Sequence, residues 1–205
     1  MELKIIDDNR YGQNVYVCFD GEDAVVIDPG DNFSAIKNFI AEKNLRLKAI
    51  LLTHGHYDHT ICVNELRDFT AAPVYAHADE AKLLQSATWN RSEHRALDVS
   101  VVADKFFGDG DVFIISKNAR LKIIHTPGHT AGGVCYYDEE GGVIFTGDTL
   151  FRETIGRTDM PTGDHATLLK SVREKLFSLP SDVIVYPGHE ESTTIGHEKQ
   201  NNMRA

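Results

Sequence analysis

The sequence contains no apolar run that approaches the roughly 20 residues needed to cross a membrane as a helix. Its first residues, MELKIIDD, are too polar for a secretory signal, which needs a longer apolar core. Cysteine is scarce, and Cys18, Cys62 and Cys135 are odd in number and far apart. This spacing is typical of buried free thiols in a reducing compartment, not of a disulfide framework. These absences predict a cytoplasmic protein that is not inserted in a membrane.

Positive charge is also scarce, because 21 Lys and Arg stand against 31 Asp and Glu and leave a net charge of −10. This balance argues against nucleic acid or an anionic membrane surface as a partner. The hydrophobic content of 41% and the absence of a low-complexity linker are ordinary for a globular chain. We therefore expect a single domain over residues 1–205. No heptad or exposed apolar stripe stands out, so the sequence predicts no particular oligomeric state.

Histidine, by contrast, is concentrated in one motif, THGHYDH at residues 53–59. The preceding run, LKAILLT at 47–53, has the length and the apolar content of a buried strand. The following segment, HTICVNELRDF at 59–69, has apolar residues at roughly helical spacing. The motif should therefore lie on a loop that the core anchors at both ends, which is a rigid place to hold a metal.

The ligand types in this motif suit zinc, iron or manganese better than calcium, because they are imidazole nitrogens and a carboxylate. His54 and His56 alternate along the expected loop, whereas Asp58 and His59 enter the helix. The two pairs should point in different directions, which predicts two neighbouring ions. Cys62 follows on the apolar face of the helix and is interpreted as a packed residue.

The N-terminal third predicts short strands over Leu3–Ile6, Asn14–Phe19 and Ala24–Ile27, the last two joined as a hairpin. A helix, capped by Asn32 or Ser34, should follow and run to about residue 44. Between them, Asp28 is either a turn residue or a residue beside the metals, because its strand should neighbour the one that leads into the histidine motif.

The second half repeats one pattern, in which an apolar strand ends in a loop that carries a His or an Asp. His129 follows the strand predicted at 119–124, Asp148 follows 143–145, and His189 follows 183–186. Each of these turns alone is weak evidence of a site. Together with the motif, their strand ends should meet along one edge. Two batches of strands, each with helices, predict two sheets packed face to face with helices outside.

The ligand series His54-x-His56-x-Asp58-His59 followed by His129, Asp148 and His189 resembles that of the metallo-β-lactamase superfamily. The resemblance implies a four-layer αβ/βα sandwich with a dinuclear site at one edge. It implies that one ion is held by His54, His56 and His129. It implies that the other is held by Asp58, His59 and His189, and that Asp148 bridges the two.

Within that superfamily the chain is similar to short glyoxalase II-like thioester hydrolases, through residues 147–151 (GDTLF), 156–159 (GRTD) and the ending 187–198. The resemblance implies cleavage of S-D-lactoylglutathione or a related small acyl thioester. Two divalent ions, zinc being expected and iron or manganese being alternatives, would lower the pKa of a shared water. The bridging hydroxide would attack the carbonyl carbon, with Asp58 and Asp148 as the catalytic residues. No serine or cysteine nucleophile stands in a recognisable motif.

The substrate-binding residues are less well defined by the resemblance. Full-length glyoxalase II enzymes have a C-terminal helical domain that supplies basic residues to glutathione, and this chain ends soon after its last metal His. Arg157 matches a basic position of the family and either meets a substrate carboxylate or braces its loop. Asp159 and Glu191 stand where larger enzymes have aromatic residues, and these two acids argue against an anionic peptide thiol. The polar segment 86–99 has no predicted role.

Several other functions use the same ligands. The main alternative is a persulfide dioxygenase, which resembles the chain at residues 156–159 and holds a single iron by two His and one Asp. A lactone or ester hydrolase would use the same ions with a different pocket. A metal-stabilised binding module without turnover is disfavoured by the complete ligand set. An RNA-processing nuclease is disfavoured by the acidic charge and by the absence of an inserted second domain.

Overall fold

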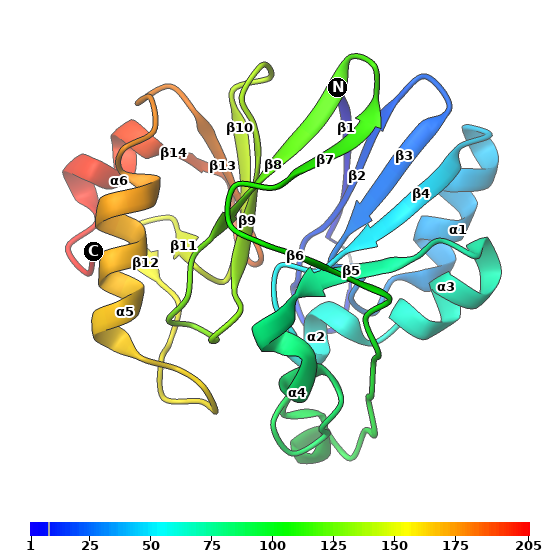
Figure 1. Ribbon diagram of the computed structural model, residues 1–205, viewed down its shortest axis with the longest axis horizontal. Helices are drawn as coiled ribbons and strands as arrows, with labels where there is room; N and C mark the ends of the chain where they lie inside the picture. Colours follow the sequence, from blue (N-terminus) through cyan, green and yellow to red (C-terminus); the bar gives the residue numbers. More distant parts are fainter. Residues whose placement is uncertain (8) are drawn as a thin grey trace.

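Two six-stranded β-sheets packed face to face form the centre of the computed structural model, which describes residues 1–7 and 9–205 (Figure 1). The first sheet has the order β1-β2-β3-β4-β5-β6, with an antiparallel start and parallel pairing from β3 onward. Its strands are β1 Glu2–Ile6, β2 Val15–Asp20, β3 Asp23–Ile27, β4 Arg46–Leu51, β5 Val74–His77 and β6 Lys105–Phe107.

The second sheet has the order β14-β13-β10-β9-β8-β7, and only β10 and β13 pair in parallel within it. Its strands are β7 Val112–Ser116, β8 Ala119–His125, β9 Val134–Asp138, β10 Val143–Gly147, β13 Ile184–Pro187 and β14 Thr193–Thr194. A small hairpin of β11 Leu150–Phe151 and β12 Thr154–Ile155 follows β10.

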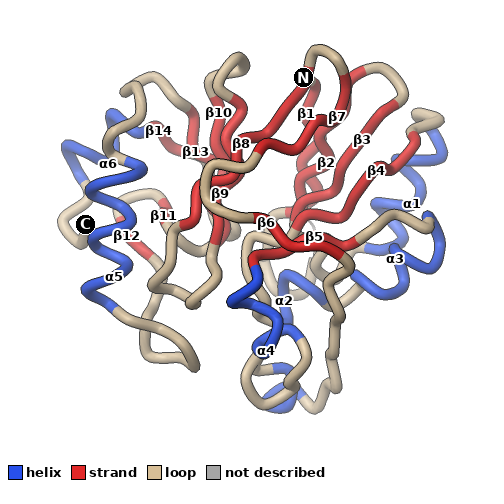
Figure 2. The backbone as a smooth tube through the Cα atoms, viewed as in Figure 1, coloured by secondary structure: helices blue, strands red, loops and turns tan. Residues whose placement is uncertain are grey.

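Helices cover the two outer faces of this pair of sheets (Figure 2). Figure 1 shows α1 and α3 beside the first sheet and α5 and α6 beside the second. The order helices, sheet, sheet, helices is the four-layer sandwich that the sequence predicts. The helices are α1 Phe33–Glu42, α2 Tyr57–Thr60, α3 Val63–Thr70, α4 Ala81–Leu84, α5 His165–Lys170 and α6 Ile195–Asn201, with single helical turns at Ala78–Glu80 and Ser92–Arg95 and a π-helical stretch at Ser171–Leu176.

Three apolar layers hold these elements together, because successive side chains of a strand point to opposite faces. In β2, for example, Val15 and Val17 face the helices of the first sheet, whereas Tyr16 and Cys18 face the second sheet. The middle layer contains the fully buried rings of Tyr136 and Phe145, and each such ring contributes roughly 2–3 kcal/mol by burial. The third layer lies between the second sheet and α5 and α6. The resulting scaffold fixes the strand ends where the predicted ligands stand.

The helix predicted after the histidine motif is interrupted. It is split into α2 and α3 because the backbone between them bonds to a neighbouring turn. The N–H of Cys62 donates to the carbonyl of Gly30 at 2.8 Å, and the N–H of Gly30 donates to the carbonyl of His59 at 3.2 Å. This exchange ties the ligand-bearing turn to the strand end at Asp28, a long-range contact that helical periodicity does not contain.

The cap of α1 and the start of the second half differ from the expectation as well. Asn32 is the cap residue of α1, but its side chain makes no capping hydrogen bond. At the start of the second half, residues 101–107 are rich in apolar side chains and are expected to form one strand, but only Lys105–Phe107 does so. The preceding residues make single backbone contacts instead, such as the N–H of Val101 to the carbonyl of Leu84 in α4 at 2.9 Å.

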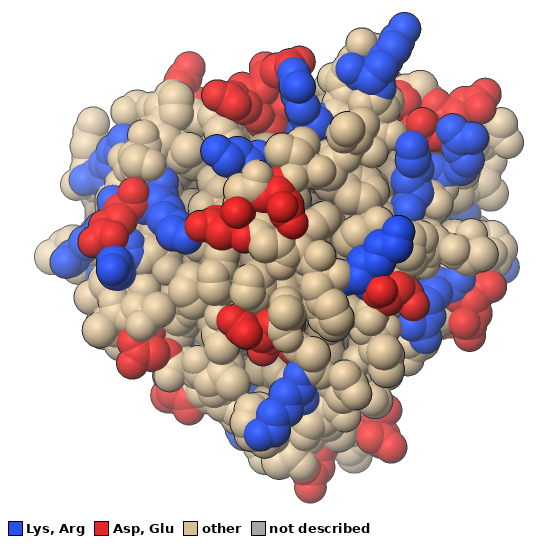
Figure 3. Space-filling model, viewed as in Figure 1, with Lys and Arg blue, Asp and Glu red and all other residues tan. Residues whose placement is uncertain are grey.

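No described helix combines the length and the apolar character that spanning a membrane requires. On the face shown in Figure 3, Lys and Arg are interspersed with Asp and Glu, and no broad patch of one sign is seen. That face therefore offers no basic stripe of the kind that nucleic-acid binding needs.

All three cysteine thiols are buried, as predicted, which leads to a test by chemical labelling. Burial raises the pKa of Cys62 and Cys135 to about 12, and it raises the pKa of Cys18 further. Because only the thiolate reacts, a thiol with that pKa is ionised to about one part in 10,000 at pH 8. We expect no rapid reaction of the native protein with a disulfide reagent at pH 8, and three reactive thiols after unfolding in guanidinium. A native thiol that reacts within seconds would contradict this packing.

Candidate metal centre

The seven predicted metal ligands lie together at one edge of the two sheets, each shortly after the end of a strand. The turn after β4 carries His54 and His56, and α2 carries Asp58 and His59. The others follow strands β8, β10 and β13 of the second sheet: His129, Asp148 and His189. The strand-end pattern of the sequence thus becomes a single cluster contributed by both sheets.

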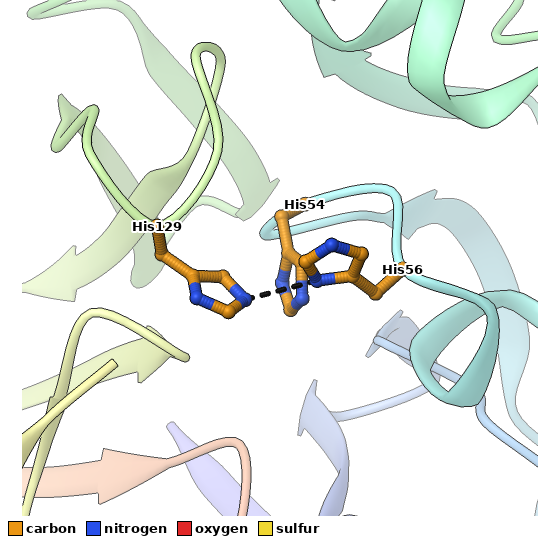
Figure 4. Close-up of side chains that lie close together, drawn as sticks. All are labelled: His54, His56 and His129. Carbon is orange, nitrogen blue, oxygen red and sulfur yellow. Dashed lines mark hydrogen bonds between the residues drawn. The ribbon is translucent and has the colours of Figure 1, made fainter. Parts of the chain in front are cut away.

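One half of the cluster consists of three histidines whose rings point toward one another (Figure 4). His54, His56 and His129 are buried, and one nitrogen of each lies within 4.8 Å of the other two. The closest pair is Nδ1 of His56 and Nε2 of His129, at 2.9 Å. Neighbouring nitrogens of a tetrahedral zinc ion would be about 3.3 Å apart, given Zn–N bonds of about 2.0–2.1 Å. The three rings are therefore arranged closely enough to hold one divalent ion.

The other half consists of Asp58, His59 and His189, whose ligand atoms also lie within 4.8 Å of one another. Nε2 of His189 is 3.4 Å from Oδ2 of Asp58. His59 is fully buried, whereas His189 retains some exposure at the rim of the site. This trio combines two nitrogens and one carboxylate, a donor set that suits zinc and iron.

Asp148 lies between the two trios and turns one carboxylate oxygen toward each. Oδ2 is 3.5 Å from Nε2 of His129 and 4.0 Å from Nε2 of His54. Oδ1 is 3.3 Å from Nε2 of His59 and 3.8 Å from Nε2 of His189. Gly188 permits this approach, because a Cβ at that position would stand 2.3 Å from Oδ1 of Asp148. The carboxylate is placed to serve both halves at once.

In four of the histidines, the ring nitrogen that faces away from the site forms a hydrogen bond. The other ring nitrogen, which faces the site, is therefore available to bind a metal. Nδ1 of His129 lies 2.7 Å from the carbonyl oxygen of Arg157, and Nδ1 of His189 lies 3.1 Å from that of Gly12. A carbonyl only accepts, so these Nδ1 atoms donate, and each Nε2 keeps its lone pair toward the site. Nδ1 of His54 and of His59 likewise bond outward. Such partners fix the tautomer and orientation that metal ligation needs.

The site contains buried polar atoms that no described residue satisfies, and a metal fits them. Nε2 of His54, Nε2 of His59 and Oδ1 of Asp148 have no hydrogen-bond partner. Nε2 of His56 is also unpaired, while its Nδ1 faces His129. An unpaired buried polar atom costs roughly 1–3 kcal/mol, so several at one point are expected where a cation binds.

The pKa values of the histidines shift in opposite directions in the first trio and at His59 of the second. Burial lowers the pKa of His54, His56 and His129, that of His56 to about 3, so the first trio is neutral and ready to ligate. Burial acts in the same direction on His59, but the carboxylates of Asp148 and Asp28 overcome it and raise its pKa well above the usual value. Those carboxylates favour positive charge at the second trio, which a bound cation would supply in place of a proton.

Asp28 is a positioning residue beside the proposed metal ligands, and three hydrogen bonds place it there. Its Oδ1 accepts from the N–H of Thr53 at 2.8 Å, and its Oδ2 accepts from the Thr53 hydroxyl at 2.5 Å. Oδ2 also accepts from Nδ1 of His59 at 2.9 Å. The backbone of Asp28 has a φ of 48°, in the left-handed region that non-glycine residues rarely adopt. A ligand atom of Asp28 lies within 4.8 Å of those of His54 and His59, but both of its carboxylate oxygens already accept hydrogen bonds, so we assign Asp28 the role of orienting ligands.

Replacing Asp28 with asparagine should weaken metal binding at the second trio about 10- to 100-fold, the range observed when residues that orient metal ligands are changed. An amide NH₂ placed against Nδ1 of His59 would favour the other tautomer, whose proton sits on the inward Nε2. We would measure the affinity of each ion by competition with a chromogenic chelator. Asp182→Asn, an exposed aspartate ahead of β13, is the matched control. Equal affinities of D28N and wild type for both ions would show that His59 is oriented by other groups.

No role was predicted for Glu80 from the sequence. In the structure, its carboxylate connects the loop of His54 and His56 to the loop of His129. It is almost completely buried, and burial raises its pKa. Its Oε2 accepts from the N–H of Gly55 at 2.8 Å, and its Oε1 accepts from the N–H of Gly132 at 2.7 Å. Gly55 lies between His54 and His56, and Gly132 lies just after His129. The spacing of Glu80 with the buried Leu83 and Leu84 on one helical face was the available sequence signal.

The metal cluster opens into a cavity of about 270 Å³, and residues without a predicted role line its mouth. Arg91 and Arg95 come from segment 86–99, which the sequence left without a role. Arg157 also lines the cavity, but its guanidinium forms two hydrogen bonds to Asp159, at 2.6 and 2.7 Å. The Arg157 guanidinium thus pairs with a carboxylate of its own loop and not with backbone carbonyls, while the backbone carbonyl of Arg157 accepts from Nδ1 of His129. The remaining lining residues are His56, Tyr57, Asp58, His129, Asp148, Met160 and His189.

A further group of possible ligands, His77, Asp79 and His125, lies apart from this centre. The rings of His77 and His125 stack with centroids 4.0 Å apart. Nδ1 of His77 accepts from the N–H of Asp79 at 3.3 Å, and Nε2 of His125 lies 2.9 Å from the carbonyl oxygen of Ala131. These contacts account for the cluster without an ion.

Comparison with known proteins places this architecture in a large group. Residues 8–189 match the family described as the metallo-beta-lactamase superfamily. A hydroxyacylglutathione hydrolase, GloC, from Haemophilus influenzae is 35% identical, and the alignment covers 98% of this chain and 97% of that protein.

Solved structures show the same fold over nearly the whole chain. The B3 metallo-beta-lactamase BLEG-1 is 36% identical, with a TM-score of 0.93 and 98% of both chains covered. TTHA1623 in a di-iron-bound form is 32% identical, with a TM-score of 0.89, covering 98% of this chain and all of that one. ETHE1 from Myxococcus xanthus is 29% identical, with a TM-score of 0.81, covering 99% of this chain and 84% of that one. The fold is therefore shared over nearly the whole chain, whereas the activities indicated by these names differ, and two metal ions are named only for TTHA1623.

Proposed function

The chain belongs to the metallo-beta-lactamase superfamily and is a metallo-hydrolase, and we propose that it cleaves acyl thioesters of the S-D-lactoylglutathione type. The observation that carries the proposal is the pair of ligand trios joined by Asp148 at the base of a small cavity. The end-to-end similarity to a hydroxyacylglutathione hydrolase supports the thioester as the bond that is cleaved.

The two trios of the structure correspond to the proposed ligands of the two ions. His54, His56 and His129 would hold one ion, and Asp148 would reach both ions. The second ion would be held by the remaining trio, Asp58, His59 and His189. Zinc is the expected metal for these nitrogen and carboxylate donors, with iron or manganese as alternatives. When bound, two such ions lower the pKa of a water molecule and polarise a carbonyl group.

The chain's own residues supply orientation. Asp58 lines the cavity, and its carboxylate would orient the attacking water toward the thioester carbon. Outward hydrogen bonds on the histidines keep the ligands in place as charge develops, so little reorganisation is needed. A thiolate leaves readily without a proton, and this suits a cavity wall that offers no histidine outside the ligand set. The reaction therefore needs no covalent intermediate on the protein.

The experiment combines metal analysis with a substrate panel. Purified protein would be analysed for metal and then assayed by loss of thioester absorbance with S-D-lactoylglutathione and with other acyl thioesters. We expect about two ions per chain and turnover of at least one thioester. One iron per chain, no thioester hydrolysis and oxygen uptake with glutathione persulfide would instead establish the dioxygenase. Turnover of lactones or simple esters alone would establish a lactone or ester hydrolase.

A further inference from the structure

Three arginines stand at the mouth of the cavity, although the chain as a whole has a net charge of −10. Arg91 and Arg95 come from segment 86–99, and Arg157 comes from the loop after Asp148. The cavity beneath them is small, about 270 Å³, against roughly 300–1,000 Å³ for a typical ligand site. A thioester that places its carbonyl at the metals must therefore leave part of its thiol portion at this mouth.

Segment 86–99 is fixed to the ligand-bearing helix, so its arginines have defined positions. Asn90 is fully buried, and its carbonyl accepts from the N–H of Tyr57 at 3.0 Å, one residue before the ligand Asp58. The side chain of Asn90 closes the segment on itself, donating to the carbonyl of Val99 at 2.7 Å and accepting from the N–H of Ser92 at 2.9 Å. A loop tied in this way belongs to the wall of the site.

The backbone at Arg91 is unusual, with a φ of 73°. A non-glycine residue in the left-handed region costs of order 1 kcal/mol, and such residues cluster at functional sites. The anchored Asn90 immediately before it and the helical turn at Ser92–Arg95 after it hold the backbone in that conformation. The consequence is that the Arg91 side chain stands at the cavity, not in solvent away from it.

The charges around the mouth leave two of the three guanidinium groups without an acid. Asp159 is paired with Arg157, and Glu191 is paired with Arg152 at 2.8 Å. These are the two acids that argued against an anionic thiol in the sequence, and in the structure both are neutralised. Arg95 donates from Nε to the hydroxyl of Tyr57 at 3.1 Å, a neutral partner. Among residues 1–7 and 9–205, none forms an ion pair with Arg91 or Arg95.

We propose that Arg91 and Arg95 bind an anionic group on the thiol portion of the substrate and thereby select thioesters of negatively charged thiols. The proposal rests on the proposed thioester hydrolysis and names its substrate class. Guanidinium groups present parallel N–H donors that match carboxylate and phosphate oxygens, so either anion fits. Arg157 is a third cation that Asp159 already occupies. The two arginines are specificity-determining residues and take no part in bond cleavage.

The test compares three thioesters of one acyl group in the full-length, metal-loaded protein. The thiols would be neutral N-acetylcysteamine, glutathione with two carboxylates, and 4′-phosphopantetheine with a phosphate. In the Arg91→Ala/Arg95→Ala variant, we expect KM for an anionic thioester to rise about tenfold or more, with a smaller change in kcat, because two charge-assisted contacts are lost. Arg91→Lys/Arg95→Lys should recover part of the loss. Arg120→Ala, which removes a surface arginine paired with Glu140, is the matched control.

A binding measurement separates this proposal from the proposed function. The affinity of S-methylglutathione, a thioether that cannot be hydrolysed, would be measured by titration calorimetry for wild type and the double alanine variant. Weaker binding by the variant, with no thioester hydrolysed by wild type, would remove the hydrolase and retain the anion site. If the double alanine variant loses activity equally on neutral and anionic thioesters, the anion site is overturned. It is likewise overturned if the wild type does not bind the thioether. A preference between carboxylate and phosphate would identify the natural anion.

Discussion

Asp148→Ala will lose both bound metal ions and reduce thioester hydrolysis by more than about 100-fold, beyond the range observed for residues that only orient a ligand. Two divalent ions would bring four positive charges into this site, and among the proposed ligands only Asp58 and Asp148 carry negative charge to offset them. Each oxygen of Asp148 faces a different trio, so its removal affects both ions. Metal content by plasma mass spectrometry and steady-state hydrolysis would measure the two losses together.

Two further variants give this result its meaning. Asp148→Asn keeps the shape and removes the charge, and it should fail nearly as completely if electrostatic compensation is the main contribution. Asp182→Asn, on an exposed turn, should leave metal content and rate unchanged. Circular dichroism must show that Asp148→Ala is folded. A folded variant that retains two ions and most of the hydrolytic rate would remove Asp148 from the centre and with it the proposed division of the ligands.

The clustering of the proposed ligands was predictable because the signal for each of these residues is local. A strand pattern followed by His54, His129, Asp148 or His189 is visible within about ten residues of sequence. In a sandwich of two sheets, strand ends that carry such residues can lie along one edge, so the pattern led us to expect that they would cluster. The alternation of apolar side chains likewise predicted which faces of the strands pack, and the structure confirms two sheets with outer helices.

The residues that hold the ligands were harder to predict, because their contacts cross long sequence separations. Asp28 reaches Thr53 and His59 only because β3 and β4 pair in parallel with a particular register. Arg91 reaches the cavity only because the carbonyl of Asn90 accepts from the backbone of α2. Composition gives segment 86–99 the appearance of an ordinary polar loop, and no periodicity within it encodes that contact.

The contacts of Glu80 also cross long sequence separations and were not predicted. Its replacement has the largest expected effect on stability. Glu80→Ala would leave the N–H groups of Gly55 and Gly132 buried without acceptors. Each such group costs roughly 1–3 kcal/mol, whereas removal of a buried carboxylate relieves part of its own desolvation. We therefore expect Glu80→Ala to lower the free energy of unfolding by about 2–4 kcal/mol, measured by urea denaturation of the metal-free protein. Glu80→Gln keeps one acceptor oxygen and should cost less.

The metal readout distinguishes a specific role of Glu80 from general weakening. Glu80 accepts hydrogen bonds from the loop of His54 and His56 and from the loop of His129, which together make the first trio, and neither bond involves the second trio. Its loss should therefore weaken the first ion more than the second, the reverse of the pattern expected for D28N. The control Glu42→Gln changes an exposed acid at the end of α1 and should alter neither ion. Equal weakening of both ions in Glu80→Ala would mean that the site responds to overall stability alone. Opposite selectivities in the two variants would show that each trio is supported by its own buried carboxylate.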